Sequence, residues 1–290
     1  MGIGKMTDKD DIKREPVPSP SEIKEVVENI QSEDSKKLQE SFKPYIERAC
    51  AHTTFFVRNS LDPELREYLF PSLDIDRVIE YDFSKSNIEV YVLNKEDNEK
   101  FNKQRGYDLE TLATAFTRKE SKGYTGTEKP LLVFGFVPPK KREEISNEEN
   151  IILGKMSLIS AFNHELLHIL GLNTSRIPFA LTEGLVEFLA QTITKKDEYF
   201  AKYPHLHRYL PVAYGSVTVA ISILVNTLVR NDLPLSTVIR GFGKGETDSL
   251  ITVSRKIAEV YGEEFSLKLP RVAEDTPYEL LEYIKKAQAK

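Results

Sequence analysis

The chain has 290 residues, of which 40% are hydrophobic and 29% are charged, and its formal net charge is -5. This composition is typical of a globular protein and excludes a wholly disordered or fibrous chain. The acidic balance argues against nucleic acid as a partner, because phosphate binding requires a clustered excess of Lys and Arg. Cys50 is the only cysteine, so an intrachain disulfide is excluded.

The sequence contains no run with the length and apolarity of a membrane span. Residues 1–11 are charged and lack the apolar core of a signal peptide. The most apolar later stretch, residues 217–229, is too short for a bilayer and contains Thr, Ser and Asn. We therefore expect no membrane partner and a cytoplasmic protein.

The N-terminal part of the chain predicts a tail followed by helices. Residues 1–20 are polar and rich in proline towards their end, which predicts a disordered tail. From Ser21 to about Leu61 apolar residues recur at spacings of three and four, as in a helix. Pro44 lies inside this run and is expected to break or kink it.

Three β-rich runs come next. Residues 78–83 and 87–94 flank three polar residues, a pattern that predicts a hairpin. Residues 130–137 read PLLVFGFV and predict a third strand. Two prolines and a charged loop follow, so we place a domain boundary near residue 150. It separates residues 21–150, with N-terminal helices and a small β-sheet, from residues 151–290, for which we expect two helices that carry the functional residues, followed by further helices.

The segment Ile151–Leu172 is apolar on nearly all sides, which predicts a helix in the core, capped by Asn150. It contains the sequence HELLH, with His164, Glu165 and His168. Histidines four residues apart face the same side of a helix, about 6 Å apart along its axis, so both rings can reach one ion. A chance motif on a solvated helix is the alternative, but the apolar neighbours favour burial, where unpaired polar groups are costly.

These residue types are those found in zinc sites that catalyse hydrolysis. Zinc in hydrolytic sites takes three protein ligands and a water, whose pKa it lowers towards about 7. Glu165 is then placed to accept a proton from that water. A second helix, over about Ala180–Ile193, offers Glu183 and Glu187 from one face, and spacing alone does not decide which of them is the third ligand.

The combination of HELLHILG, a short connection and LTEGLVEFL resembles the gluzincin zinc metallopeptidases, which include thermolysin and aminopeptidases of the HExxH type. The resemblance implies an α/β (α+β), zincin-like fold, with a small mixed sheet over the HExxH helix and a helical C-terminal lobe. It implies Zn²⁺ as cofactor, Glu183 as third ligand and Glu187 as the partner of His164. The chain departs from the family at Thr182, where Asn is common, and in its short spacing of 14 residues between His168 and Glu183.

The resemblance also implies two substrate-binding features. An edge strand, for which Leu131–Val137 is the candidate, would pair with an extended substrate, although an interior strand fits the same residues. A Tyr or His near the metal would stabilise the oxyanion of the reaction. Tyr214 is our candidate, with His205 and His207 as alternatives.

The sequence therefore predicts a zinc metallopeptidase, a hydrolase that cleaves a peptide or protein substrate. No motif of the Gly-Xaa-Met-Glu-Asn type for a substrate amine precedes HExxH. Its absence favours an endopeptidase or a dedicated protein-processing protease. The alternative is a catalytically inactive zincin-fold module that binds a peptide or protein, and the oligomeric state stays open.

Overall fold

The computed structural model describes residues 19–74, 76–77, 81–106, 113–116, 129–137, 143–172, 174, 176–212 and 214–289. The tail predicted for residues 1–20 lies outside these ranges except for its last two residues. Ser19 caps helix α1, Pro20–Ile30, and forms a capping box with Glu22. Pro20, the last residue of the predicted tail, therefore belongs to a helix and occupies its first turn, where no N–H is needed.

Helix α2, Glu33–Val57, continues through Pro44, so of the predicted break or kink the break is wrong and the kink stays a prediction. Buried Phe42 and Ile46 flank the proline and pack into the core, which offsets the lost backbone hydrogen bond. The helical run is interrupted earlier, before Ser32, which caps α2. Helix α3, Pro63–Leu69, follows after a short 3-10 turn.

The strands form one small sheet. Strands β1 (Glu89–Leu93), β2 (Ala113–Phe116) and β3 (Leu131–Gly135) are arranged in the order β1-β3-β2. Strand β1 is parallel to β3, and β2 is antiparallel to it. Helix α4, Lys95–Arg105, follows β1.

The hairpin predicted between residues 78 and 94 is wrong. Phe83–Lys85 forms a 3-10 turn, and β1 pairs in parallel with β3. Residues 78–80 of the first predicted run lie outside the described residues. Parallel pairing requires a long crossover, and a local turn pattern carries no information about such a distant partner.

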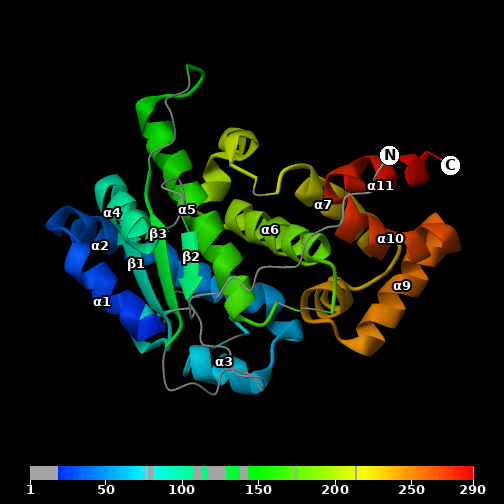
Figure 1. Ribbon diagram of the computed structural model, residues 1–290, viewed down its shortest axis with the longest axis horizontal. Helices are drawn as coiled ribbons and strands as arrows, with labels where there is room; N and C mark the ends of the chain where they lie inside the picture. Colours follow the sequence, from blue (N-terminus) through cyan, green and yellow to red (C-terminus); the bar gives the residue numbers. More distant parts are fainter. Residues whose placement is uncertain are drawn as a thin grey trace, which may run out of the picture.

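Both faces of the sheet are covered by helices (Figure 1). Leu131 and Val133 of β3 pack with α1 and α4. Leu132 and Phe134 belong to the main core, together with side chains of α2 and α5. This alternation is that of a strand buried on both faces.

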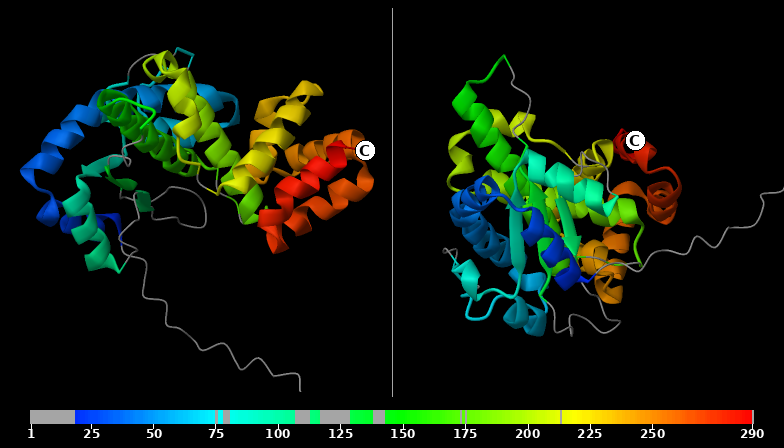
Figure 2. Two further views of the ribbon diagram at one scale, coloured as in Figure 1. Left: turned by 90° about the horizontal axis from the view of Figure 1, so that it is seen from above. Right: turned by 60° about the vertical axis from the view of Figure 1, so that its left-hand side comes forward.

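The second half of the chain is helical. It consists of α5 (Asn147–Ile169), α6 (Phe179–Lys196), α7 (Ser216–Arg230), α8 (Leu235–Val238), the π-helical turn η5 (Ile239–Gly243), α9 (Thr247–Tyr261), α10 (Glu263–Asp275) and α11 (Leu280–Gln288). Helix α5 begins earlier than predicted, because Ser146 and Glu149 form a capping box ahead of Asn150. Helices α9 to α11 lie at the opposite end of the molecule from α1 and α4 (Figure 2).

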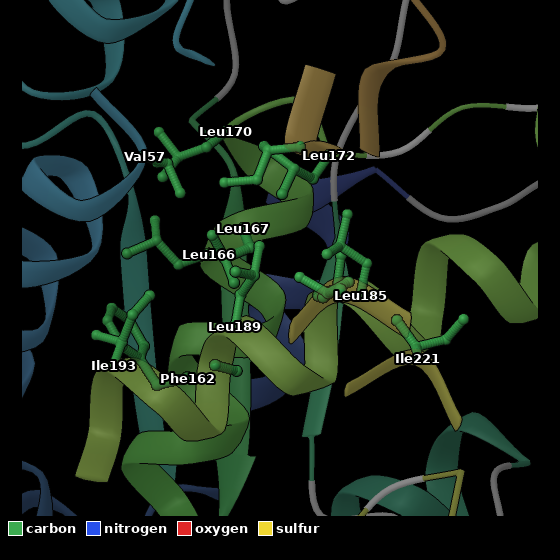
Figure 3. Packing of buried hydrophobic residues seen from close by; sticks show 14 of the residues in the cluster. Val57, Phe162, Leu166, Leu167, Leu170, Leu172, Leu185, Leu189, Ile193 and Ile221 are labelled. Atoms are coloured by element: carbon green, nitrogen blue, oxygen red, sulfur yellow. The ribbon is translucent and has the colours of Figure 1, made fainter. Parts of the chain in front are cut away.

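The α/β (α+β) class predicted from the sequence is wrong, because the chain is mostly helical. The three strands contain only five, four and five residues. Side chains of α5, α6 and α7 pack together in the main hydrophobic core (Figure 3), to which β1 and β3 also contribute. The core includes side chains from both sides of the boundary predicted near residue 150. No helix in the described ranges combines the length and apolarity needed to cross a membrane.

Gly184 explains how closely α6 and α7 pack. A Cβ at this position would lie 2.6 Å from Cγ1 of Ile221 on α7, a distance that side chains do not tolerate. Glycine is therefore required next to Glu183 for packing. The contact also sets how α6 is rotated against its neighbours.

Candidate metal centre

The two histidines of HELLH lie on one face of α5, near its C-terminal end. Their ring centroids are 4.8 Å apart, and the Nε2 atoms of His164 and His168 approach to 3.1 Å. His164 is buried, and His168 is half-buried. The helical spacing thus directs both rings to one point, as expected.

Helix α6 supplies the acid. Oε2 of Glu183 lies 3.3 Å from Nε2 of His164 and 3.3 Å from Nε2 of His168. The ligand atoms of the three residues all lie within 4.8 Å of one another. Glu187, one turn later, instead lies behind the ring of His164, with its Oε2 3.0 Å from Nδ1. The structure thus separates the two acids: Glu183 faces the Nε2 atoms and Glu187 faces Nδ1.

The hydrogen bonds behind the rings fix their tautomers. The carbonyl of Leu172 lies 2.9 Å from Nδ1 of His168, and a carbonyl only accepts, so Nδ1 donates. Nδ1 of His164 likewise donates to the carboxylate of Glu187. A neutral imidazole donates from one nitrogen only, so in their neutral forms both rings present the lone pair of Nε2. Together with the Glu183 carboxylate they then form three converging acceptors, which a bound cation, or a proton on His164, would bridge.

The spacing of these atoms fits zinc. Ligands that bind zinc tetrahedrally at about 2.0 to 2.1 Å are about 3.3 Å from one another. The three separations here are 3.1, 3.3 and 3.3 Å. Two imidazoles and one carboxylate also leave a fourth position open, as in hydrolytic zinc sites.

The electrostatics of the site favour positive charge. Burial lowers the pKa of His164, but the carboxylates of Glu183 and Glu187 outweigh this effect and raise it to about 9. Burial raises the pKa of Glu183, but the two histidines outweigh it and hold the pKa at about 2. The acid is therefore ionised at neutral pH and available as a ligand.

Glu187 is held on both of its oxygens. Its Oε2 accepts from His164, and its Oε1 accepts from Nε2 of Gln191 at 2.8 Å. Gln191 also reaches the carbonyl of Pro211 at 3.3 Å. The sequence motifs do not indicate Gln191 or the carbonyl of Leu172 as part of the site. The signal for Gln191 is its position four residues after Glu187, on the same helix face.

Two cavities share the site. The larger, of about 1060 Å³, is lined by Glu165, His168 and Glu183 among others. The smaller, of about 380 Å³, is lined by His164, Glu165 and Glu187 among others. Glu165 and Tyr214 line both cavities. The three converging side chains therefore lie between two cavities.

Glu165 is half-buried and makes no hydrogen bond with any described residue. Burial raises the pKa of its carboxyl group above the usual value. An unengaged carboxylate with a raised pKa, beside the predicted ligands, is suited to accepting a proton.

Tyr214 lies at the site, whereas the alternative histidines do not. Its ring stacks at 6.3 Å on that of His164, and its φ of 59° is unusual for a residue other than glycine. Burial, and then the charge of Glu183, raise the pKa of its hydroxyl, which keeps it protonated. His205 contacts Glu149 and His207 contacts a backbone carbonyl, and neither lines the two cavities.

The candidate edge strand needs correction. Strand β3 is paired on both sides, by β1 and β2, so it is an interior strand. Leu131–Val137 was the candidate for an edge strand that pairs with an extended substrate. This prediction is wrong for Leu131–Phe134, because each of these residues already pairs with β2. Phe136 and Val137, beyond this register, line the smaller cavity.

The chain was compared with protein families, curated proteins and solved structures. No protein-family model matches the chain, and no match is found among curated proteins or solved structures. The resemblance to gluzincins therefore stays a prediction that rests on the motifs of α5 and α6.

Proposed function

We propose that this protein is a zinc metallopeptidase in which His164, His168 and Glu183 bind the metal. The observation that carries the proposal is the convergence of three atoms that can act as metal ligands, at 3.1 to 3.3 Å, with both Nδ1 atoms already engaged as donors. Hydrogen bonding to a carbonyl or carboxylate behind a metal-binding histidine is typical of zinc sites.

The remaining side chains have the chemistry for peptide hydrolysis. A bound zinc ion supplies Lewis acidity and lowers the pKa of water. Glu165 accepts a proton from the attacking water and delivers it to the leaving amine, a role that its raised pKa supports. The protonated hydroxyl of Tyr214 donates to the oxyanion.

The two cavities support action on bonds inside a polypeptide. One lies on the side of His168 and Glu183, and the other on the side of His164 and Glu187. A peptide that extends into both places residues on either side of the cleaved bond. An endopeptidase, or a protease that processes one protein, fits this arrangement better than an enzyme that removes single terminal residues.

Metal analysis is the first test. We expect about one zinc per chain in the purified protein by mass spectrometry, and its loss in His168→Ala and Glu183→Ala. His205→Ala, which changes a surface histidine paired with Glu149, is the control and should retain zinc. A parent protein that holds no metal after zinc is supplied contradicts the proposal.

Cleavage of a peptide library then tests the chemistry. We expect the parent to cleave and Glu165→Gln to retain zinc without turnover. Equal cleavage by Glu165→Gln and the parent contradicts the role of Glu165. Zinc binding without cleavage of peptides or of candidate protein substrates instead supports the inactive binding module.

A further inference from the structure

The turn that ends α5 places an acceptor behind His168. Gly171 has a φ of 95°, and its N–H donates to the carbonyl of His168 at 3.0 Å. The N–H of Leu172 donates to the carbonyl of Leu167, also at 3.0 Å. These two bonds form a Schellman motif, for which glycine is the preferred residue. The motif reverses the chain, so that the Leu172 carbonyl faces Nδ1 of His168.

A distant part of the chain fixes Leu172 in this place. Leu172 is fully buried, and a Cβ on Gly243 would lie 2.9 Å from its Cγ. Gly243 is the last residue of the π-helical turn η5. The leucine side chain therefore fills the space that the missing side chain of Gly243 leaves open, and Figure 3 shows Leu172 at the end of α5.

The same turn contacts the helix that carries the acid. The hydroxyl of Thr182, directly before Glu183, donates to the carbonyl of Phe242 at 3.2 Å. Thr182 is buried, so this bond is protected from water. Turn η5 thus contacts Leu172, whose carbonyl lies behind His168, and Thr182, which directly precedes Glu183. π-Helical turns are rare and often occur at functional sites.

We propose that Gly171 and the turn η5 are positioning elements of the metal site, an inference that rests on the proposed function. Gly171 sets the path of the chain, Gly243 holds Leu172, and Thr182 anchors the start of α6. Together they fix the ring of His168 and the carboxylate of Glu183 before a metal binds. None of these residues is itself a ligand.

Two glycines allow a matched test. Gly171 and Gly106 both follow the end of a helix, α5 and α4, with left-handed φ values of 95° and 68°. A Cβ at Gly106 would meet nothing within 4 Å among the described residues, and one at Gly171 would meet only Leu65 in ordinary contact at 3.7 Å. Alanine therefore introduces left-handed backbone strain at both positions and no clash. Only Gly171 lies next to the metal site.

We expect both alanine variants to have similarly lowered midpoints of urea denaturation. The affinity for Zn²⁺, measured by competition with a chromophoric chelator, should fall about tenfold or more in Gly171→Ala, a typical cost of losing a contact behind a ligand. Gly106→Ala should bind Zn²⁺ like the parent. Equal zinc affinity in the two variants overturns the inference. A parent that binds no zinc overturns the proposed function as well.

Thr182 provides a second test that does not alter the backbone. Thr182→Val keeps the shape but removes the hydroxyl that contacts Phe242, whereas Thr182→Ser keeps the hydroxyl. We expect weaker Zn²⁺ binding and an altered Co²⁺ absorption spectrum in Thr182→Val, and recovery of both in Thr182→Ser. Unchanged affinity and spectrum in Thr182→Val overturn the role of η5.

Discussion

At the scale of single residues, His164 and His168 are held by different acceptors. Nδ1 of His164 faces the carboxylate of Glu187, and that of His168 faces the neutral carbonyl of Leu172. A charged acceptor strengthens the hydrogen bond and raises the basicity of the ring more than a neutral one. Glu187 is also held by Gln191, so its orientation does not depend on a metal.

Glu187→Gln should therefore weaken metal binding without unfolding the protein. The substitution keeps the shape of the side chain and removes its charge, and we expect the Zn²⁺ affinity to fall by about 10- to 100-fold. Chelator competition at pH 7 measures this change. Glu148→Gln, which alters an exposed acid in the first turn of α5, is the control. An unchanged affinity in Glu187→Gln would show that this carboxylate does not support the site.

Helical periodicity explains which site residues the sequence could predict. It places His164 and His168 on one face, and this required no tertiary information. It could not separate Glu183 from Glu187, because residues four apart share a face. Their roles depend on how α6 is rotated against α5 and α7, which the close contact at Gly184 helps to set.

At the scale of elements, long segments with a helical repeat of apolar residues are predicted most accurately. Helix α6 was expected over about residues 180–193 and spans Phe179–Lys196. The apolar pattern alone places the start of α5 at Ile151, whereas the capping-box pattern of Ser146 and Glu149 marks its true start at Asn147. The sheet was poorly predicted, since strand partners are far apart in the sequence and β1 pairs with β3 across α4 and β2.

Asp97 connects α4 to the start of α2, and its substitution tests how much this contact stabilises the fold. It lies in the first turn of α4 and is almost fully buried. Its Oδ2 accepts from the N–H and hydroxyl of Ser32 and from the hydroxyl of Ser35, at 2.6 to 2.8 Å. Burial raises the pKa of Asp97, but these bonds outweigh it and lower the pKa to about 2.

A carboxylate with a lowered pKa stabilises the fold at pH values above its unfolded pKa of about 3.9. This contribution is lost as the pH falls towards about 2. Asp97→Asn should cost about 1 to 3 kcal/mol at pH 7, a usual range for hydrogen bonds to a charged group. Urea denaturation at pH 7 and pH 3 measures the free energy of unfolding, and the difference from the parent should shrink at pH 3. Asp34→Asn, on the exposed side of α2, is the control; a difference independent of pH would contradict the argument.

At the scale of the molecule, the larger cavity joins the metal site to the C-terminal helices. Its walls include Phe179 at the start of α6 and Tyr278 between α10 and α11. Both aromatic side chains are well exposed, at 66% and 69%. Exposed aromatic residues that line a cavity provide apolar contact area for a ligand. The C-terminal helices thus contribute to the space beside the predicted ligands, although they supply none of them.

Tyr278→Ala should therefore change substrate selection and leave stability nearly unchanged. An aromatic contact contributes about 0.5 to 1.5 kcal/mol, so kcat/KM should fall roughly threefold to tenfold for peptides with a bulky apolar residue beside the cleaved bond. Peptides with a small residue there should be cleaved as by the parent. Leu267→Ala removes a side chain that is 81% exposed on α10 and does not line the cavity, so it is the matched control. Equal losses for bulky and small residues in Tyr278→Ala would mean that the cavity wall affects catalysis through the fold and not through contact with the substrate.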